Sequence, residues 1–356
     1  MIESIEIKNF GPLADFAWSG LGSVNLVIGR HGTGKTFLLK ALYCAIRTLE
    51  ERRGDEPRTH AEILSDKLYW TFQPDRIGDL VRHGSNAELS VSLMLRHEIV
   101  VNTPPSPVRF AFDRAAERSA IQFEGGACVR DARSIFIPAK EILSLQSVIL
   151  RSRESDRMFG FDDTYVDLAK ALSWQRDRTE LAEPAKGAMA ELEERVGGHM
   201  QMELKPPPDG SPIPKWVWRL KANGVDYPVG LAAEGTRKIG VLYALFLNRQ
   251  LGHNSIIFID EPEAGLHPEA ISAFIDLIAA LVEVYRGRLQ FFIASHSYFV
   301  VKKLYLIAQQ KGLSVPIAMA DGGQWQMTDL REGMPANPII DESIRLYEQE
   351  VELALK

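Results

Sequence analysis

Short apolar runs recur along the chain, and most have the length of a β-strand rather than a helix. Nearly continuous apolar runs predict buried strands at residues 23–29, 134–138, 255–259 and 289–294. Such runs are typical of parallel strands that are covered on both faces. Alternating apolar and polar positions instead predict an antiparallel sheet with one exposed face, at 87–95, 97–101 and 108–112.

Helical periodicity separates these strands. It predicts helices at 35–53, within 60–84, over much of 140–200, from about His267, at 297–312 and from about residue 340. Further strands are expected at 2–8, 200–204, 215–220, 225–227, near 315–320 and at 324–328. Strands that alternate with helices in this way indicate an α/β protein with a parallel sheet.

A complete GxxxxGK[ST] motif lies between the strand at 23–29 and the helix that follows it. Its residues are Gly29, Arg30, His31, Gly32, Thr33, Gly34, Lys35 and Thr36. The backbone amides of such a loop cradle phosphate oxygens at a helix N-terminus, where the helix dipole favours negative charge. Lys35 would contact the β- and γ-phosphates, and the Thr36 hydroxyl would hold Mg²⁺. The alternative is a glycine turn that opens a helix by chance.

Two other predicted strands end in side chains that can do chemistry. Asp260 and Glu261 follow the strand at 255–259, and His296 follows the strand at 289–294. Carboxylates at the end of a buried strand are costly unless they meet a metal or a reacting group. We assign Asp260 to Mg²⁺, Glu261 to the attacking water, and His296 to the γ-phosphate or that water. Alternatively, the two acids open the next helix and the histidine is structural.

Taken together, these three strand ends resemble those of ABC-type ATPases. The segment 231–240 stands where that superfamily has its signature loop, with Glu234-Gly235-Thr236 in place of the transporter sequence Gly-Gly-Gln. This version resembles the compact SMC-related and OLD-like AAA-family ATPases, many of which act in bacterial anti-phage defence. The opening segment 5–12, which contains Asn9, resembles their first strand. So does the segment 261–268, in which His267 replaces the D-loop aspartate of transporters.

The resemblance implies a P-loop NTPase fold, an ABC-type ATPase head with an antiparallel β-subdomain and an inserted, mainly helical lobe. The implied division is an N-terminal ATPase lobe, the helical lobe, a C-terminal ATPase lobe and a terminal helix, at 1–138, 139–200, 201–335 and 336–356. ATP and Mg²⁺ are the implied cofactors, and slow hydrolysis of ATP to ADP and phosphate is the implied activity. The implied catalytic residues are Lys35, Glu261 and His296, and the implied metal ligands are Thr36 and Asp260. The implied nucleotide contacts are residues 29–36, Phe37, Asn9 and the signature residues Glu234, Gly235 and Thr236.

The resemblance also implies partners. In this superfamily the signature turn binds the γ-phosphate held by the opposite subunit, so we expect an ATP-sandwich homodimer, with higher assemblies left open. Past Gln324 no acidic nuclease constellation follows, so we expect the effector, a nuclease or a toxin, to be a separate protein. A DNA-repair ATPase of the RecF type is the alternative, and an ABC transporter subunit is a weaker one. The Q-loop glutamine is missing at its usual place after 134–138, which leaves Gln146 and Glu141 as candidates.

Composition limits the class of protein and its expected location in the cell. The 356 residues are 46% hydrophobic and 25% charged, which is ordinary globular material. No apolar run approaches the roughly 20 residues that span a bilayer, and the acidic N-terminus does not resemble a secretory signal. Cys44 and Cys128 form no disulfide framework. We therefore expect a cytoplasmic protein that does not bind membranes. The net charge of −6 argues against a uniformly basic nucleic-acid binder, although local DNA contact stays open.

Three features allow two interpretations each. A basic stripe could contact DNA or be a solvated face of mixed charge, and the second is favoured. A pair of tryptophans on one strand face could stack on bases or belong to the core, and the core is favoured. The apolar residues of the last helix could dock a partner or pack on their own domain, and packing is slightly favoured. The residues concerned are Lys140, Arg151, Arg153 and Arg157; Trp216 and Trp218; and Leu346, Val351 and Leu355.

Overall fold

The computed structural model describes residues 1–53, 56–96, 106–118, 121–125, 130, 132–173, 190, 193–194, 198–205, 215–222, 224–248, 250–321 and 323–355. The strand expected at 97–101 and the second cysteine, Cys128, lie outside these ranges, as does the part of the expected helical lobe at 174–189.

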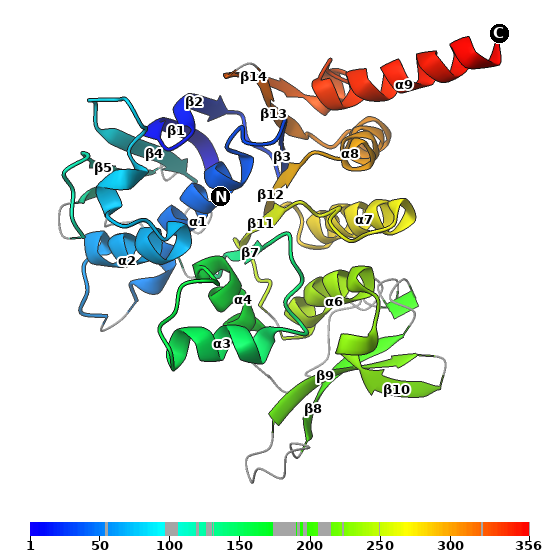
Figure 1. Cartoon of the computed structure of the whole chain (residues 1–356), viewed down its shortest axis with the longest axis horizontal. Coiled ribbons are helices and arrows are strands. Elements are labelled where there is room, and N and C mark those ends of the chain that lie inside the picture. The colour runs from blue at the N-terminus through cyan, green and yellow to red at the C-terminus, as the bar shows by residue number, and fades with distance from the viewer. Residues whose placement is uncertain are drawn as a thin grey trace.

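A six-stranded sheet forms the centre of the molecule (Figure 1). Its strand order is β14-β13-β3-β12-β11-β7, and every neighbouring pair is parallel except β13 with β14. The bounds are β3 (Val24–Gly29), β7 (Ile135–Ile137), β11 (Ile256–Asp260), β12 (Gln290–Ser295), β13 (Pro316–Asp321) and β14 (Gln324–Asp329). In register, Asp260 pairs with Ala294 and Ser295 with Ile28. The carboxyl ends of β3, β11 and β12 therefore lie at one edge of the sheet.

Helices cover both faces of this sheet, which is why its strands are apolar throughout. Leu26 and Ile28 of β3 face one core cluster, and Val27 faces the other. The first cluster includes residues of α6 (Glu234–Leu247), α7 (Pro268–Val284) and α8 (Tyr298–Lys311). The second includes residues of α1 (Lys35–Glu51) and α2 (His60–Phe72), which is followed by the short helix η1 (Ile77–Leu80).

An antiparallel sheet packs beside α1 and completes the second cluster. Its order is β2-β1-β4-β5-β6. The strands are β1 (Ile2–Phe10), β2 (Leu13–Ser19), β4 (Leu89–Leu95), β5 (Ser106–Phe112) and β6 (Gln122–Glu124). In β4 buried residues alternate with half-exposed ones, as the sequence pattern predicts.

A smaller unit lies beyond β7, at the bottom of Figure 1. It contains α3 (Gln146–Glu154), α4 (Asp163–Ser173) and a three-stranded sheet of order β10-β9-β8. The strands are β8 (His199–Lys205), β9 (Lys215–Ala222) and β10 (Val225–Pro228), and the turn η2 (Val229–Leu231) leads from them to α6. Trp218 of β9 is 5% exposed and belongs to the first core cluster, in agreement with the core interpretation. The Trp216 side chain lies outside the described part of the structure.

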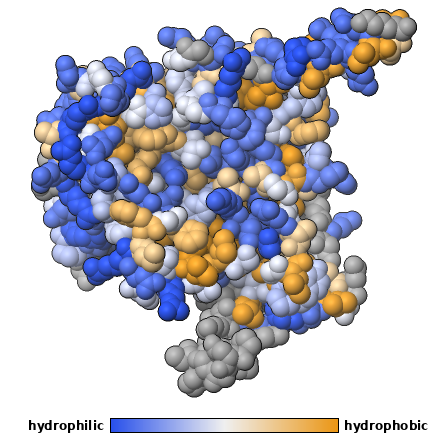
Figure 2. All heavy atoms as spheres, in the orientation of Figure 1, coloured by the Kyte–Doolittle hydropathy of each residue, from blue (hydrophilic) through white to orange (hydrophobic). Residues whose placement is uncertain are grey.

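The last helix, α9 (Pro338–Ala354), follows the turn η3 (Leu330–Glu332) and projects from the body of the molecule (Figure 1). Ile339 and Ile340 at its start pack against the core. Leu346 and Leu355 are 54% and 82% exposed, so the expectation that this helix packs on its own domain is wrong. Figure 2 shows apolar side chains interspersed with hydrophilic ones along it. The sequence pattern identifies the apolar residues of this helix, but it does not tell whether they pack on the same chain.

None of the helices in the described ranges combines the length and the apolarity needed to cross a membrane.

Candidate nucleotide-binding site

The P-loop joins β3 to α1 and uses glycine where other residues would clash. Gly29 and Gly34 have φ angles of 154° and 93°, which side chains rarely adopt. A Cβ at Gly29 would lie 2.9 Å from the Cβ of Ala320, and one at Gly34 would lie 2.9 Å from Cγ of Pro12. Gly34 is also the N-cap of α1, which has no side-chain cap and no acidic residue in its first turn. The first amides of α1 are thus available to an anion.

Lys35 and Thr36 follow this loop and point to different partners. Lys35 is 7% exposed, and its Nζ donates hydrogen bonds to the carbonyls of Gly29 (2.8 Å) and Arg30 (2.9 Å). Burial lowers the pKa of Lys35, against the carboxylates of Glu261 and Asp260, which raise it. The Thr36 hydroxyl lies 3.0 Å from both carboxylate oxygens of Asp260. The two residues expected to hold Mg²⁺ therefore touch, although 224 positions separate them in the sequence.

The acidic end of β11 contains one buried and one more accessible carboxylate. Asp260 is 7% exposed, and burial raises its pKa to about 6, against the hydrogen bond from Thr36, which lowers it. The Glu261 side chain is 31% exposed and lies at the mouth of the site. The ring of His296 brings its Nδ1 to 3.4 Å from Oε1 of Glu261. It also lies 5.0 Å, centroid to centroid, from the ring of His31 in the P-loop. The three expected catalytic residues thus share one edge with the loop.

Glu263 has a role at this edge that sequence reasoning missed. Its Oε1 accepts hydrogen bonds from the Ser295 hydroxyl and from the His296 amide, both at 2.9 Å. It therefore ties the end of β12 to the turn after β11 and orients His296. The sequence contained a hint of this role, since Glu263 stands only two positions after Glu261.

The signature residues Glu234, Gly235 and Thr236 begin α6 and pack on the turn that follows β11. A Cβ at Gly265 would lie 2.9 Å from Cδ of Glu234, and a Cβ at Gly235 would lie 2.8 Å from Cδ2 of Leu266. Within the described ranges, no hydrogen bond or ion pair joins these three residues to the P-loop of the same chain. The structure brings the signature turn against the acidic strand end instead.

Asn9 and Phe37, expected near the nucleotide, have their side chains engaged elsewhere. The Asn9 amide donates to the carbonyl of Glu88 (3.2 Å). The Phe37 ring packs against Phe10 and Phe72, with centroids 5.0 and 4.4 Å away. The backbone amide of Phe37 lies in the uncapped first turn of α1 and stays available to an anion.

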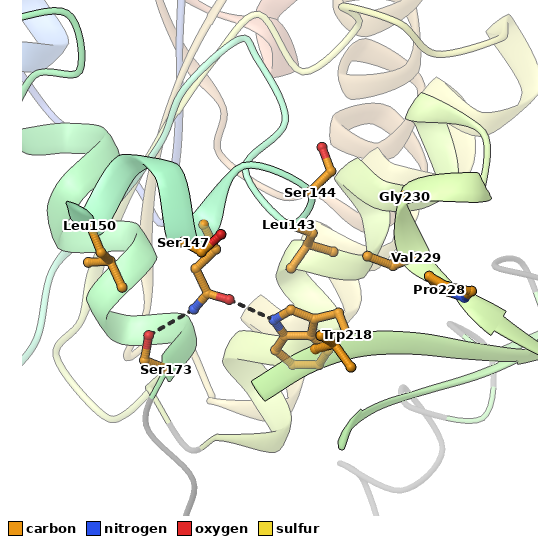
Figure 3. A pocket seen from close by; sticks show the side chains of 11 residues that line it. Leu143, Ser144, Ser147, Leu150, Ser173, Trp218, Pro228, Val229 and Gly230 are labelled. Atoms are coloured by element: carbon orange, nitrogen blue, oxygen red, sulfur yellow. Dashed lines mark hydrogen bonds between the residues drawn. The ribbon is translucent and has the colours of Figure 1, made fainter. Parts of the chain in front are cut away.

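Both candidates for the Q-loop ligand have side-chain partners other than Thr36 and Asp260 in the described residues, and their assignment stays a prediction. The Gln146 amide donates to Ser173 Oγ (2.8 Å) and accepts from the indole N–H of Trp218 (3.2 Å), at the wall of a cavity of about 420 Å³ between α3 and β9 (Figure 3). Glu141 pairs with Arg237 (3.2 Å). Both sequence positions were inferred from order along the chain, which does not tell where a side chain points.

The basic stripe also has other contacts. Arg153 forms an ion pair with Asp163, and its guanidinium lies 3.5 Å above the Trp70 ring. Lys140, Arg151 and Arg157 are exposed. These contacts agree better with a solvated face of mixed charge than with a continuous DNA-binding stripe.

Comparisons with known proteins support this description. A family model described as "AAA domain, putative AbiEii toxin, Type IV TA system" matches residues 44–302, nearly three quarters of the chain. The match begins after the P-loop and includes the signature segment, the acidic strand and His296. No curated protein sequence matches the chain.

Solved structures of Smc heads are similar in fold. One is an Smc head bound to the C-winged helix domain of ScpA, at a TM-score of 0.54 and 14% identity, covering 92% of this chain and 97% of that one. Another is the Smc head domain with an extended coiled coil bound to the C-terminal domain of ScpA, derived from Pyrococcus furiosus, at a TM-score of 0.50 and 13% identity, with 98% of each chain covered. The predicted fold class, an ABC-type P-loop ATPase head, is confirmed. The chain belongs to the AAA-domain family named above.

Proposed function

We propose that this protein is an ATP-binding and ATP-hydrolysing switch that works as a head-to-tail homodimer. The observation that carries the proposal is the contact between Thr36 and Asp260, 3.0 Å at the edge of the sheet where Lys35, Glu261 and His296 also lie. A hydroxyl and a carboxylate held together beside a phosphate-binding loop are the protein half of a Mg²⁺–nucleotide site.

The residues fit ATP and Mg²⁺. The uncapped first turn of α1 and the Lys35 ammonium suit a triphosphate. Thr36 and Asp260 would hold the metal, which neutralises phosphate charge when it is bound. In the described part of the chain no group of three His, Cys, Asp or Glu side chains is arranged to bind a metal. Oxygens from the nucleotide and from water are therefore expected to complete the coordination shell, as Mg²⁺ prefers.

Glu261 is the residue we assign to the water that attacks the γ-phosphorus. Its carboxylate accepts a proton as the new P–O bond forms and the bond to the bridging oxygen of ADP breaks. Lys35 stabilises the charge on the departing β,γ-bridge. His296, 3.4 Å from Glu261, is placed to donate a hydrogen bond to a phosphate oxygen or to orient the carboxylate.

The dimer is proposed from the resemblance to ABC-type ATPases. Glu234, Gly235 and Thr236 would contact the γ-phosphate held by the second copy, so ATP would join the two heads and hydrolysis would release them. Larger assemblies are compatible with the same interface.

We further propose that the switch works in the cytoplasm, regulating a separate effector, a nuclease or toxin, in an anti-phage defence system. Membership in a family whose description names a toxin–antitoxin system supports this role. The structurally similar Smc heads are bound to domains of ScpA, which is a precedent for a head of this fold that binds a partner protein. Exposed apolar residues of α9, such as Leu346 and Leu353, offer a surface for such a partner.

Two experiments test the proposal. The first measures ATP hydrolysis and ATP binding by the wild type and by Lys35→Ala, which is expected to lose ATP affinity because the phosphates lose their main cation. The second compares phage plating on cells with the intact locus, with Lys35→Ala, and with each neighbouring gene deleted. Protection that survives both Lys35→Ala and every deletion would contradict the ATP-driven, effector-dependent role.

A further inference from the structure

Lys238 lies on α6, one turn after Glu234 of the signature residues, and is only 1% exposed. A charged side chain in such a place is costly unless all its donors are used. Its Nζ donates to three backbone carbonyls, those of Glu261 (2.6 Å), Ala139 (3.0 Å) and Ala264 (3.4 Å). The three donors of an ammonium group are thus matched by three acceptors.

The shortest of these hydrogen bonds ends on the backbone of the proposed catalytic residue. Glu261 has a φ angle of 46°, a left-handed conformation that residues other than glycine rarely adopt. Its amide donates to the carbonyl of Ala294 (2.9 Å), and its carbonyl also accepts from the amide of Ala264 (3.0 Å). Hydrogen bonds to both its amide and its carbonyl therefore hold Glu261 in this unusual backbone conformation. Among the described residues, Lys238 is the one whose side chain makes such a bond.

This conformation decides where the carboxylate points. In β11 the Asp260 side chain faces Thr36, and an ordinary extended residue after it would face the opposite side of the sheet. The left-handed turn at Glu261 instead brings its Oε1 to the His296 ring at the same edge. A contact that keeps the Glu261 backbone in this conformation therefore also keeps the Glu261 carboxylate in the site.

Lys238 also connects this turn to the signature segment. It stands four residues after Glu234 on the same helix, whose first turn packs on Gly265 and Leu266. A displacement of α6 would move Nζ relative to the Glu261 carbonyl. Burial lowers the pKa of Lys238 to about 8, against the neighbouring carboxylates, among them Glu263, Asp260 and Glu261. The side chain therefore still carries its three protons near neutral pH.

We propose that Lys238 is a positioning residue for Glu261, and that it transmits the position of the signature helix to the hydrolytic carboxylate of the same subunit. In a head-to-tail dimer the signature turn of one chain serves one ATP while its Glu261 serves the other, so this lysine links the two sites. The inference rests on the proposed function, because it assigns regulation of the same site.

The test compares Lys238→Met with Lys67→Met, the same substitution at a second buried lysine that bonds only carboxylates away from the site. Lys238→Met is expected to bind a fluorescent ATP analogue with Mg²⁺ within about twofold of the wild type, because the P-loop is unchanged. Its kcat is expected to fall about 100-fold, the usual loss when a reacting group is misplaced. Lys67→Met is expected to keep kcat. Lys238→Gln, which retains one N–H donor group, serves if the methionine variant does not fold.

A second readout needs no hydrolysis. Hydrogen–deuterium exchange of the nucleotide-free protein is expected to be faster in Lys238→Met at the amides of Ala264 and Leu266, and unchanged in the peptide that contains β3. Faster exchange confined to this turn supports the positioning role even in a protein that hydrolyses no ATP, in which case the proposed function fails and not the inference. Unchanged exchange with unchanged kcat overturns the inference.

Discussion

Two buried lysines show how the same residue type serves two regions of this molecule. Lys67 lies between α1, α2 and α4, where its Nζ is 2.7 Å from Glu51, 2.9 Å from Asp167 and 3.3 Å from Asp163. Lys238 lies at the strand ends, and its hydrogen bonds to described residues all end on carbonyls. Burial acts to lower both pKa values, yet the three carboxylates outweigh it and raise the pKa of Lys67, while that of Lys238 falls to about 8.

The two lysines therefore stabilise different things. Lys67 holds helices together, whereas Lys238 holds a backbone turn in its conformation. The partners of Lys67 are one carboxylate on α1 and two on α4, so its contacts join the helix after the P-loop to the smaller unit. The partners of Lys238 are backbone carbonyls, two in the turn that contains the proposed catalytic residue Glu261 and one at Ala139 after β7. We therefore expect changes at the first region to lower stability and changes at the second to lower activity.

The largest expected effect is a loss of kcat on substitution of Glu261, the proposed catalytic residue after β11. Glu261→Gln should reduce kcat by roughly 10²–10⁴-fold, because the water loses its proton acceptor. The thermal midpoint should stay close to that of the wild type, since the side chain is partly exposed. Steady-state phosphate release and thermal melts measure the two quantities. Glu269→Gln, at an exposed position in the first turn of α7, is the matched control and should change neither. A normal kcat in Glu261→Gln would remove Glu261 from its role.

The next largest effect is expected in the first region, around Lys67. Lys67→Met removes the cation that Asp163, Asp167 and Glu51 share, while Arg153 still pairs with Asp163 and Arg47 with Asp167 and Glu51. The free energy of unfolding should fall by about 1.5–3 kcal/mol, the value of a hydrogen bond to a charged group, because arginines keep the carboxylates paired. Urea unfolding measures it. Lys303→Met removes a more exposed ion pair with Asp276 and should cost less than about 1 kcal/mol. Equal losses in the two variants would show that the buried cluster has no special role.

The pH dependence of hydrolysis, compared between the wild type and Lys238→Met, isolates the contribution of Lys238. Its folded-state pKa of about 8 lies below the ordinary value of 10.5, so the native state holds fewer protons than the unfolded state between these values. Stability therefore rises with pH from about 8 to 10.5 on account of this group. Hydrolysis should instead decline several-fold over the same range, because the ammonium loses a donor. Thermal melts at each pH check that the protein stays folded where the decline is measured, and the decline should be absent in Lys238→Met.

The smallest effect concerns a single hydroxyl in the Lys67 region. Tyr43 is buried in α1 and donates to Asp167 at 2.8 Å. Tyr43→Phe should cost about 1 kcal/mol of unfolding free energy, the usual net value of a buried hydrogen bond. Its kcat should match the wild type. A selective loss of kcat in this variant would mean that the cluster communicates with the site after all.

Much of the fold followed from sequence because strand ends are marked by local chemistry. Glycines, Asp260 and His296 each follow a continuous apolar run, and parallel strands bring their carboxyl ends to one edge. Lys238 gave no such signal. In the segment Glu234–Lys238 it resembles a solvated charge, and its three carbonyls come from segments 23 to 99 residues away. The contacts of Gln146 were hidden from the sequence for the same reason, since its partners Trp218 and Ser173 are defined only by packing.

The most direct test of the proposed switch is the native mass of the Glu261→Gln protein with and without Mg²⁺–ATP. We predict a monomer without nucleotide and a dimer holding two ATP molecules when Mg²⁺–ATP is present, because the nucleotide joins the P-loop of one chain to the signature turn of the other. A protein that binds one ATP per chain and stays monomeric would contradict the head-to-tail sandwich.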